Sequence, residues 1–145
     1  MTLYEDGRRV VARAITFIDS SVLLIERFRK EGENVLHYFT IPGGGVEEGE
    51  TYEEAAIRET KEETCCNIGL LKYLTCEDYP NGRCYWYYGK YLNGTPTLGG
   101  EEKEYNNPDN SYKVVLINYS DLDKINILGQ GKALIKQCLD YYKKD

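Results

Sequence analysis

The sequence predicts a layered α/β or α+β domain, and three patterns along the chain support this fold class. Short runs rich in Val, Ile, Leu and aromatic residues lie between turn signals over 9–41 and again over 68–92, which is typical of β-strands. Good helix formers occupy 51–64 between these two groups, and a second helical pattern ends the chain. The length of 145 residues, 41% of them hydrophobic, suits one domain over 1–145.

The first group of strands begins with a predicted hairpin. Residues 9–28 are rich in Val, Ile, Leu and Phe and are interrupted only by Asp19-Ser20-Ser21, which predicts two strands joined by a tight turn. A polar stretch over 29–34 separates this hairpin from a short strand over 35–41. The strand ends at a proline, and we expect the three glycines that follow, 43–45, to form a flexible loop.

The helix predicted over 51–64 has recognisable signals at its beginning. Thr51 is expected to be its N-cap, because a threonine side chain can accept a hydrogen bond from a free backbone amide of the first turn. Glu53 and Glu54 lie in that turn, where the helix dipole favours acidic side chains. The later elements are strands over 68–76 and 83–92 joined by a turn at 80–82, a long loop over 94–111, a strand over 113–118 and an amphipathic helix over about 130–142.

The composition disfavours several classes of protein. A net charge of -6 and a pI near 4.9 argue against a stable complex with nucleic acid. No apolar run approaches the roughly 18 to 20 residues that cross a bilayer, and no signal-peptide pattern follows Met1, so we expect a cytoplasmic protein without a membrane partner. Five cysteines without paired C-x-x-C spacing predict neither a disulfide framework nor a zinc site.

Three acidic side chains share one face of the predicted helix. At about 100° per residue, Glu59, Glu62 and Glu63 fall within an arc of roughly 100°. Like charges four residues apart weaken a helix, and a hard cation such as Mg²⁺ would offset their repulsion. A solvated acidic surface with Arg58 and Lys61 as counter-charges explains the same pattern, so both interpretations stay open at this point.

The glycines before the helix favour the ligand-site interpretation. They let the backbone approach a bound group closely, and a glycine carbonyl there would add an oxygen ligand. Gly44 and Gly49 have the glycine spacing of a P-loop, but Glu50 stands where that motif needs lysine to reach the phosphates. ATPase and kinase chemistry are therefore set aside.

The segment from Gly44 to Cys66 resembles the Nudix box, the signature of hydrolases that cleave nucleoside diphosphates linked to another moiety. It reads Gly44-x5-Glu50-x7-Arg58-Glu59-Thr60-x-Glu62-Glu63-x-Cys65-Cys66. Two positions depart from the family pattern: Thr60 stands where an aliphatic residue is usual, and Cys65 stands where glycine usually ends the helix. Neither change removes a charged group, and a left-handed Cys65 would cost up to about 1 kcal/mol of stability relative to glycine.

This resemblance implies an α/β/α sandwich with a mixed β-sheet and a metal-dependent pyrophosphohydrolase activity. In such an enzyme Glu59, Glu62 and Glu63, joined by the carbonyl of Gly44, would bind Mg²⁺ or Mn²⁺. The metal would neutralise the charge of the diphosphate and orient the attacking water.

The resemblance also implies roles for other residues of the box. Glu50 and Arg58 would hold the glutamates in register, and Glu62 or Glu63 would be the general base. Some members of the family take the base from a distant loop, and the residues of this chain that match that description are Glu101, Glu102 and Glu104.

Contacts to the substrate are expected outside the box. The candidates are Arg27, Phe28, Tyr38, Trp86 and Tyr88. Alternate residues of a strand face opposite sides of the sheet, so either Trp86 and Tyr88 or Tyr85 and Tyr87 face a pocket, and not both pairs. An aromatic wall would stack a nucleobase, and core packing explains the same residues equally well.

Two functional classes stay open. The first is a hydrolase acting on a small-molecule nucleotide, where nucleoside triphosphates, damaged nucleotides and ADP-ribose-like compounds are not separated by the sequence. The second is a Nudix-fold module that senses a nucleotide or ADP-ribose-like ligand without turnover. The complete set of Glu59, Glu62 and Glu63 favours the hydrolase, and monomer and homodimer remain equally open.

Overall fold

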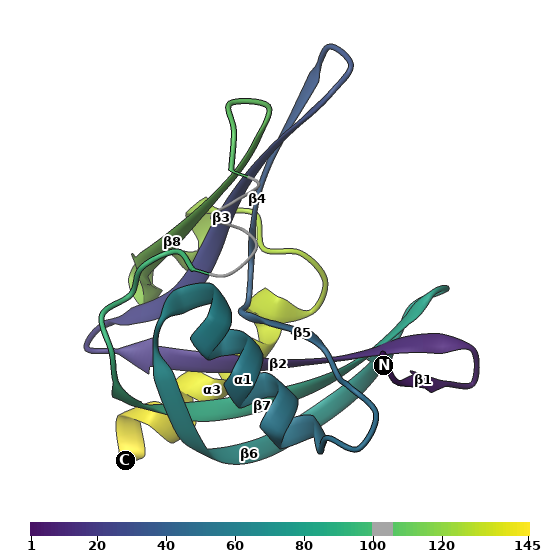
Figure 1. The fold of residues 1–145 in the computed structure, drawn as a ribbon. Coiled ribbons are helices and arrows are strands. Elements are labelled where there is room, and N and C mark those ends of the chain that lie inside the picture. The colour runs from purple at the N-terminus through teal and green to yellow at the C-terminus, as the bar shows by residue number, and fades with distance from the viewer. Residues whose placement is uncertain (100–105) are drawn as a thin grey trace.

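The computed structural model describes residues 1–99 and 106–145, apart from the side chain of Leu70. It is an α/β/α sandwich in which the two helices cover opposite faces of a twisted mixed sheet (Figure 1). The predicted fold class is therefore confirmed. The strands are β1 (Tyr4–Glu5), β2 (Arg8–Ile18), β3 (Ser21–Glu31), β4 (Asn34–Thr40), β5 (Gly43–Gly45), β6 (Asn67–Asp78), β7 (Gly82–Asn93) and β8 (Asn110–Asn118). The helices are α1 (Tyr52–Thr64), the 3-10 helix η1 (Tyr119–Lys124) and α3 (Gly131–Lys144).

The sheet is centred on β2. Its path runs β4-β3-β2-β7-β6, while β1 and β5 also pair with β2 and β8 pairs with β3. Strands β2 and β7 are parallel, and the other pairs are antiparallel. Since β3 touches β2 only near their shared turn, β4, β3 and β8 continue as an arm that rises away from the two helices (Figure 1).

The core has two parts because successive residues of β2 face opposite sides of the sheet. Ala12 and Ala14 face α1, where the equally small Ala55 and Ala56 let the helix approach the sheet closely. The opposite face packs against α3 through larger side chains. They include Ile15, Phe17, Trp86, Leu134, Ile135 and Cys138.

The first hairpin differs from the prediction. The polar stretch over 29–34 belongs to the strands: β3 continues to Glu31 and β4 begins at Asn34, with Gly32 in the turn at φ +63°. Polar side chains are tolerated there because β3 pairs with β4 on one edge and with β8 on the other, so its backbone is hydrogen-bonded although its side chains meet solvent.

The expectation of a flexible loop over 43–45 is also wrong. These residues form β5, whose register places Gly43, Gly44 and Gly45 beside Arg13, Ala12 and Val11. Pairing with β2 supplies the order that glycine alone does not. Over the described residues, no helix combines the length and the apolar character that crossing a membrane requires.

Candidate active site

Strand β5 lets a carboxylate from α1 lie directly against the backbone. A Cβ atom on Gly44 would stand 2.6 Å from the carboxylate carbon of Glu59. Real Cβ atoms essentially never come within 3.0 Å of another heavy atom, so any side chain at this position would displace the carboxylate. The missing Cβ of Gly44 therefore brings Gly44 and Glu59, both predicted metal ligands, into contact.

The other two glycines of β5 make room for arginines of β2. A Cβ on Gly43 would stand 2.6 Å from Cγ of Arg13, and a Cβ on Gly45 would stand 2.5 Å from Nη2 of Arg9. Arg9 and Arg13 lie four residues apart and so face the same side of β2. The glycine strand thus brings a carboxylate and two guanidinium groups to one place.

Helix α1 begins with a capping box that orders its first turn. Thr51 Oγ1 accepts a hydrogen bond from the amide of Glu54 at 3.0 Å, and Glu54 Oε1 accepts one from the amide of Thr51 at 2.9 Å. Thr51 is the N-cap, as predicted. The Thr-x-x-Glu spacing is the sequence pattern of a capping box, in which Glu54 accepts a hydrogen bond from the N-cap amide.

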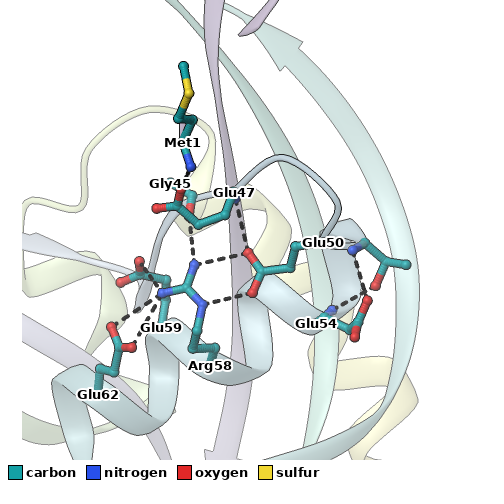
Figure 2. A network of polar contacts seen from close by, with 9 residues as sticks. Met1, Gly45, Glu47, Glu50, Glu54, Arg58, Glu59 and Glu62 are labelled. Atoms are coloured by element: carbon teal, nitrogen blue, oxygen red, sulfur yellow. Dashed lines mark hydrogen bonds and ion pairs between the residues drawn. The ribbon is translucent and has the colours of Figure 1, made fainter. Parts of the chain in front are cut away.

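Arg58 links the box residues to one another (Figure 2). Its Nε and Nη2 donate to the two carboxylate oxygens of Glu50 at 2.7 and 3.0 Å, and Nη2 also donates to the carbonyl of Gly45 at 2.9 Å. Nη1 donates to Glu59 at 3.0 Å and, more weakly, to Glu62 at 3.3 Å. These hydrogen bonds lower the pKa of Glu50 and raise that of Arg58, so both groups stay charged.

The box glutamates differ widely in burial. Glu63 is 8% exposed, and its Oε1 accepts a hydrogen bond from the amide of Gly43 at 2.9 Å. The side chain of Glu62 is 51% exposed, on the solvent side of the helix. In the part of the chain that the structure describes, no group of three or more acidic, histidine or cysteine side chains is gathered closely enough to hold a metal ion.

An open polar cleft of about 330 Å³ lies against β5. Its lining residues are Arg9, Arg13, Ile25, Arg27, Thr40, Gly43, Gly44, Gly45, Glu59, Glu63 and Tyr112. Three of the predicted metal ligands, Gly44, Glu59 and Glu63, therefore border one cavity. The arginines give the same cavity a concentration of positive charge beside these ligands.

Arg27 is held in the cleft by two tyrosines. Its guanidinium carbon lies 3.7 Å from the ring centroid of Tyr112 and 5.7 Å from that of Tyr38, and its Nη2 donates to Oδ1 of Asn110 at 2.6 Å. The strand register pairs Arg27 with both tyrosines. Phe28 is next in β3 and faces the opposite side, where it stacks on His37 outside the cleft.

A second cavity of about 330 Å³ adjoins the cleft and shares Arg9, Arg13 and Thr40 with it. Trp86 is 3% exposed and lines this cavity, and Arg13 Nη1 donates to a backbone carbonyl, that of Ile41, at 2.7 Å in its wall. Tyr88 shares the face of β7 with Trp86 but lines different cavities, beside Phe17, Lys90 and Tyr141. Of the predicted aromatic pair, only Trp86 borders the site.

The C-terminal end of α1 has the left-handed cap that the sequence suggested. Cys65 adopts φ 62° and ψ 15° and donates its amide to the carbonyl of Lys61. The amides of Thr97 and Gly99 donate to the carbonyls of Thr64 and Glu63 at 2.9 and 3.1 Å, which satisfies the last turn. Glu101, Glu102 and Glu104 follow directly and lie outside the described residues.

Arg9 and Arg13 were missed by the sequence analysis. The signal was present, because both interrupt an apolar strand and the period of two places them on one face. What the sequence did not show is that the neighbouring strand consists of glycine, so that Arg9 and Arg13 on one face of it and Glu59 on the other border the same cleft.

Comparison with known families identifies the chain. The family model described as the NUDIX domain matches residues 7–125. The chain therefore belongs to the Nudix hydrolase family.

Two curated relatives show where the similarity is concentrated. A Caenorhabditis elegans protein that carries the name nudix hydrolase 1 is 34% identical over 120 residues, which is 81% of this chain and 30% of that protein. The ADP-ribose pyrophosphatase of Methanocaldococcus jannaschii is 50% identical over 46 residues, 32% of this chain and 25% of that protein. The matched segments thus span less than a third of the length of either relative.

Solved structures support the fold. A NUDIX-family hydrolase from Clostridium perfringens superposes with a TM-score of 0.70 at 18% identity, covering 92% of this chain and 97% of that one. MutT from Aliivibrio salmonicida and Vibrio cholerae gives a TM-score of 0.66 at 18% identity, with coverages of 90% and 96%. At this level of identity the likeness concerns the fold alone.

Proposed function

We propose that the protein is a metal-dependent pyrophosphohydrolase that cleaves the diphosphate linkage of a small-molecule nucleotide by attack of water on phosphorus. The observation that carries the proposal is the seating of Glu59 against Gly44, with Glu63 in the same arginine-lined cleft. Phosphate oxygens and hard cations both suit such a cavity. We further propose that residues 1–145 act as one Nudix domain in the cytoplasm.

The donor set fits Mg²⁺ or Mn²⁺. Glu59, Glu62, Glu63 and the Gly44 carbonyl offer only oxygen, which these hard cations prefer, and the missing Cβ of Gly44 lets the Glu59 carboxylate lie against that backbone. When bound, the metal would neutralise diphosphate charge and lower the pKa of the attacking water.

Arg58 has a positioning role in this proposal. It holds Glu50 on one side and Glu59 on the other, so the glutamate that lies against Gly44 is restrained before substrate arrives. A side chain restrained in this way loses less freedom when the reacting groups assemble.

Glu62 is the general base that the contacts favour. It is exposed to solvent, and the hydrogen bonds that it accepts from the described residues are long, 3.3 and 3.4 Å from Arg58, whereas one oxygen of Glu63 is engaged by the amide of Gly43. The water proton passes to Glu62 as the new oxygen–phosphorus bond forms. The bridging phosphorus–oxygen bond breaks, and its electron pair leaves with the departing phosphate.

Of the proposed substrate contacts, Arg27 borders the cleft and Trp86 borders the second cavity. Tyr38 packs against the guanidinium group of Arg27. Phe28 and Tyr88 point elsewhere, which weakens their case. The second candidate function, a module that binds a nucleotide or ADP-ribose-like ligand without turnover, would use the same cleft.

The test is release of phosphate or pyrophosphate, with and without Mg²⁺, from nucleoside triphosphates, damaged nucleotides, ADP-ribose, dinucleoside polyphosphates and capped RNA. We expect metal-dependent release, and we expect Glu62→Gln and Glu63→Gln each to lower kcat by at least about 100-fold. Glu48→Gln, at an exposed position between β5 and α1, is the matched control. Ligand binding without turnover of any compound would favour the sensing module.

A further inference from the structure

We propose that Arg9 and Arg13 form a phosphate clamp that makes the enzyme prefer nucleoside 5′-triphosphates to compounds whose diphosphate is closed at both ends, such as ADP-ribose. This inference rests on the pyrophosphohydrolase function proposed above and names its substrate class. The clamp is defined as the guanidinium groups of Arg9 and Arg13.

The clamp reaches the reaction centre because of β5. Both arginines line the cleft that contains Glu59 and Glu63, although they come from β2 on the other side of the glycine strand. The side chain of Arg9 passes over Gly45 at a distance that excludes any Cβ atom. At Gly43 a Cβ atom would meet the carbonyl of Ala12 and the Cα and Cγ atoms of Arg13. The clamp and Glu59 therefore contact opposite faces of β5, and both border the one open cleft.

Among the described residues, the clamp also has no carboxylate counter-ion of its own. Neighbouring arginines of the sheet are paired: Arg8 with Asp78, and Arg83 with Glu5, Asp6 and Asp78. Within residues 1–99 and 106–145, Arg9 and Arg13 form no ion pair with a carboxylate. Arg9 is exposed, and the half-buried Arg13 uses only Nη1 for the carbonyl of Ile41 among the contacts of the described residues, so both guanidinium groups keep donors for an anionic ligand in the cleft.

The charge of the cleft indicates which anion fits. Arg9, Arg13 and Arg27 face it together with Glu59 and Glu63, so positive charge is in excess even before a metal binds. A terminal phosphate carries about two negative charges near neutral pH, because its second pKa is about 6. Each phosphate of ADP-ribose carries about one, which Arg27 and a divalent cation already balance.

The chemistry of the clamp supports the same choice. A guanidinium group presents parallel donors that match two phosphate oxygens at once, and a terminal phosphate has three free oxygens to offer. In ADP-ribose both phosphates are esterified, so fewer oxygens are free.

Binding without turnover tests the clamp separately from catalysis. The probes are the α,β-methylene analogues of ATP and ADP-ribose, which share one base and resist hydrolysis at the α–β linkage, titrated by calorimetry in Mg²⁺. We expect the triphosphate analogue to bind at least about 10-fold more tightly to the native protein. Arg9→Gln with Arg13→Gln is expected to remove most of this preference, and the double lysine variant to restore part of it.

Arg29→Gln is the matched control, because Arg29 lies on the arm and pairs with Glu31 away from the cleft. It removes one positive charge outside the cleft, as each clamp substitution does inside it, and is expected to leave the preference unchanged. Circular dichroism and thermal unfolding establish that each variant is folded. If the double glutamine variant does not fold, the double lysine variant is measured in its place, and its preference is expected to be smaller than that of the native protein.

Each outcome decides between the two ideas. Equal or tighter binding of the ADP-ribose analogue, or a preference that survives the double substitution, overturns the clamp. Metal-dependent turnover of either parent compound would still support the hydrolase function in that case. A preference for the triphosphate that depends on the arginines, without hydrolysis of any parent compound, supports the clamp and removes the hydrolase. Failure of both analogues to bind also overturns the clamp.

Discussion

Arg58 donates hydrogen bonds to both carboxylate oxygens of Glu50, from Nε at 2.7 Å and from Nη2 at 3.0 Å. This two-point contact joins the segment after β5 to the middle of α1. Because the remaining donors of Arg58 reach Gly45 and Glu59, one guanidinium group restrains the strand, the connecting segment and the helix together.

Arg58→Lys tests this restraint. A lysine has one charged nitrogen and cannot make the two-point contact, so we expect a loss of about 2–4 kcal/mol in the free energy of unfolding. We also expect at least about a 10-fold lower kcat. Urea unfolding and steady-state kinetics measure the two effects. Lys61→Gln, at an exposed position of the same helix, is the control, and equal behaviour of the two variants would contradict the restraint.

The pH dependence of stability follows from the lowered pKa of Glu50, which the hydrogen bonds of Arg58 cause. The unfolded chain takes up a proton near the ordinary value of 4.5, above the pKa in the folded protein, so the stability that this pair contributes is complete well above pH 4.5 and is lost as pH falls through that range. Glu50→Gln is therefore expected to destabilise the protein at pH 7 and progressively less toward pH 3. A difference between the two proteins that stays constant over this range, in urea unfolding, would refute the assignment.

Gly44→Ala tests the contact between β5 and Glu59. The new methyl group would overlap the Glu59 carboxylate, so we expect at least about a 10-fold lower kcat and a higher Mg²⁺ requirement, with little loss of secondary structure. Gly69→Ala is the control, because its methyl group would meet only the movable end of Leu92. Native kinetics in Gly44→Ala would show that Glu59 does not need this position.

Thr60→Val is expected to stabilise the protein. Thr60 is fully buried, and its Oγ1 has no hydrogen-bond partner among the described residues, so an isosteric apolar side chain removes an unsatisfied group and gains about 1 kcal/mol. Thr64→Val is the opposite case, because Thr64 Oγ1 donates to the carbonyl of Thr60 at 2.7 Å, and we expect it to lose about 1 kcal/mol. Thermal unfolding of both variants decides, and a change of the same sign in both would contradict the argument.

The five thiols are expected to react at very different rates in the folded protein. Burial raises the pKa of Cys84 and of Cys138 to about 12, and Cys66 is also buried. Cys76 is exposed and Cys65 partly so. We expect iodoacetamide at pH 8 to label Cys76 and Cys65 in the folded protein, and the other three only after denaturation, which mass spectrometry of peptides measures.

Much of the box geometry was predictable because it depends on short spacings. The N-cap at Thr51, the acidic residues of one helix and the left-handed Cys65 all follow from contacts within a few turns of chain. The strand pairings were not predictable in the same way. Residues 43–45 read as a loop because glycine has no strand preference, and only pairing with the distant Val11 and Arg13 makes them a strand.

The burial of individual site residues was also hidden from the sequence. Helical periodicity placed Glu62 and Glu63 on one face, but the position of β5 decides that Glu63 is buried and Glu62 is not. Similarly, alternation in β7 grouped Trp86 with Tyr88, while only the packing of β2 and α3 around that strand separates them into different cavities. Long-range contacts set these differences.

The all-glycine strand β5 has a consequence for how this chain tolerates mutation. Its residues carry no functional group, yet a Cβ atom added to any of them would stand within 2.6 Å of an atom of Arg13, Glu59 or Arg9. In a library of single substitutions, positions 43–45 are therefore expected to be as intolerant as the glutamates of the helix. A second substitution in β5 would not compensate for the first, because each new side chain would fill space that residues of β2 or α1 already occupy.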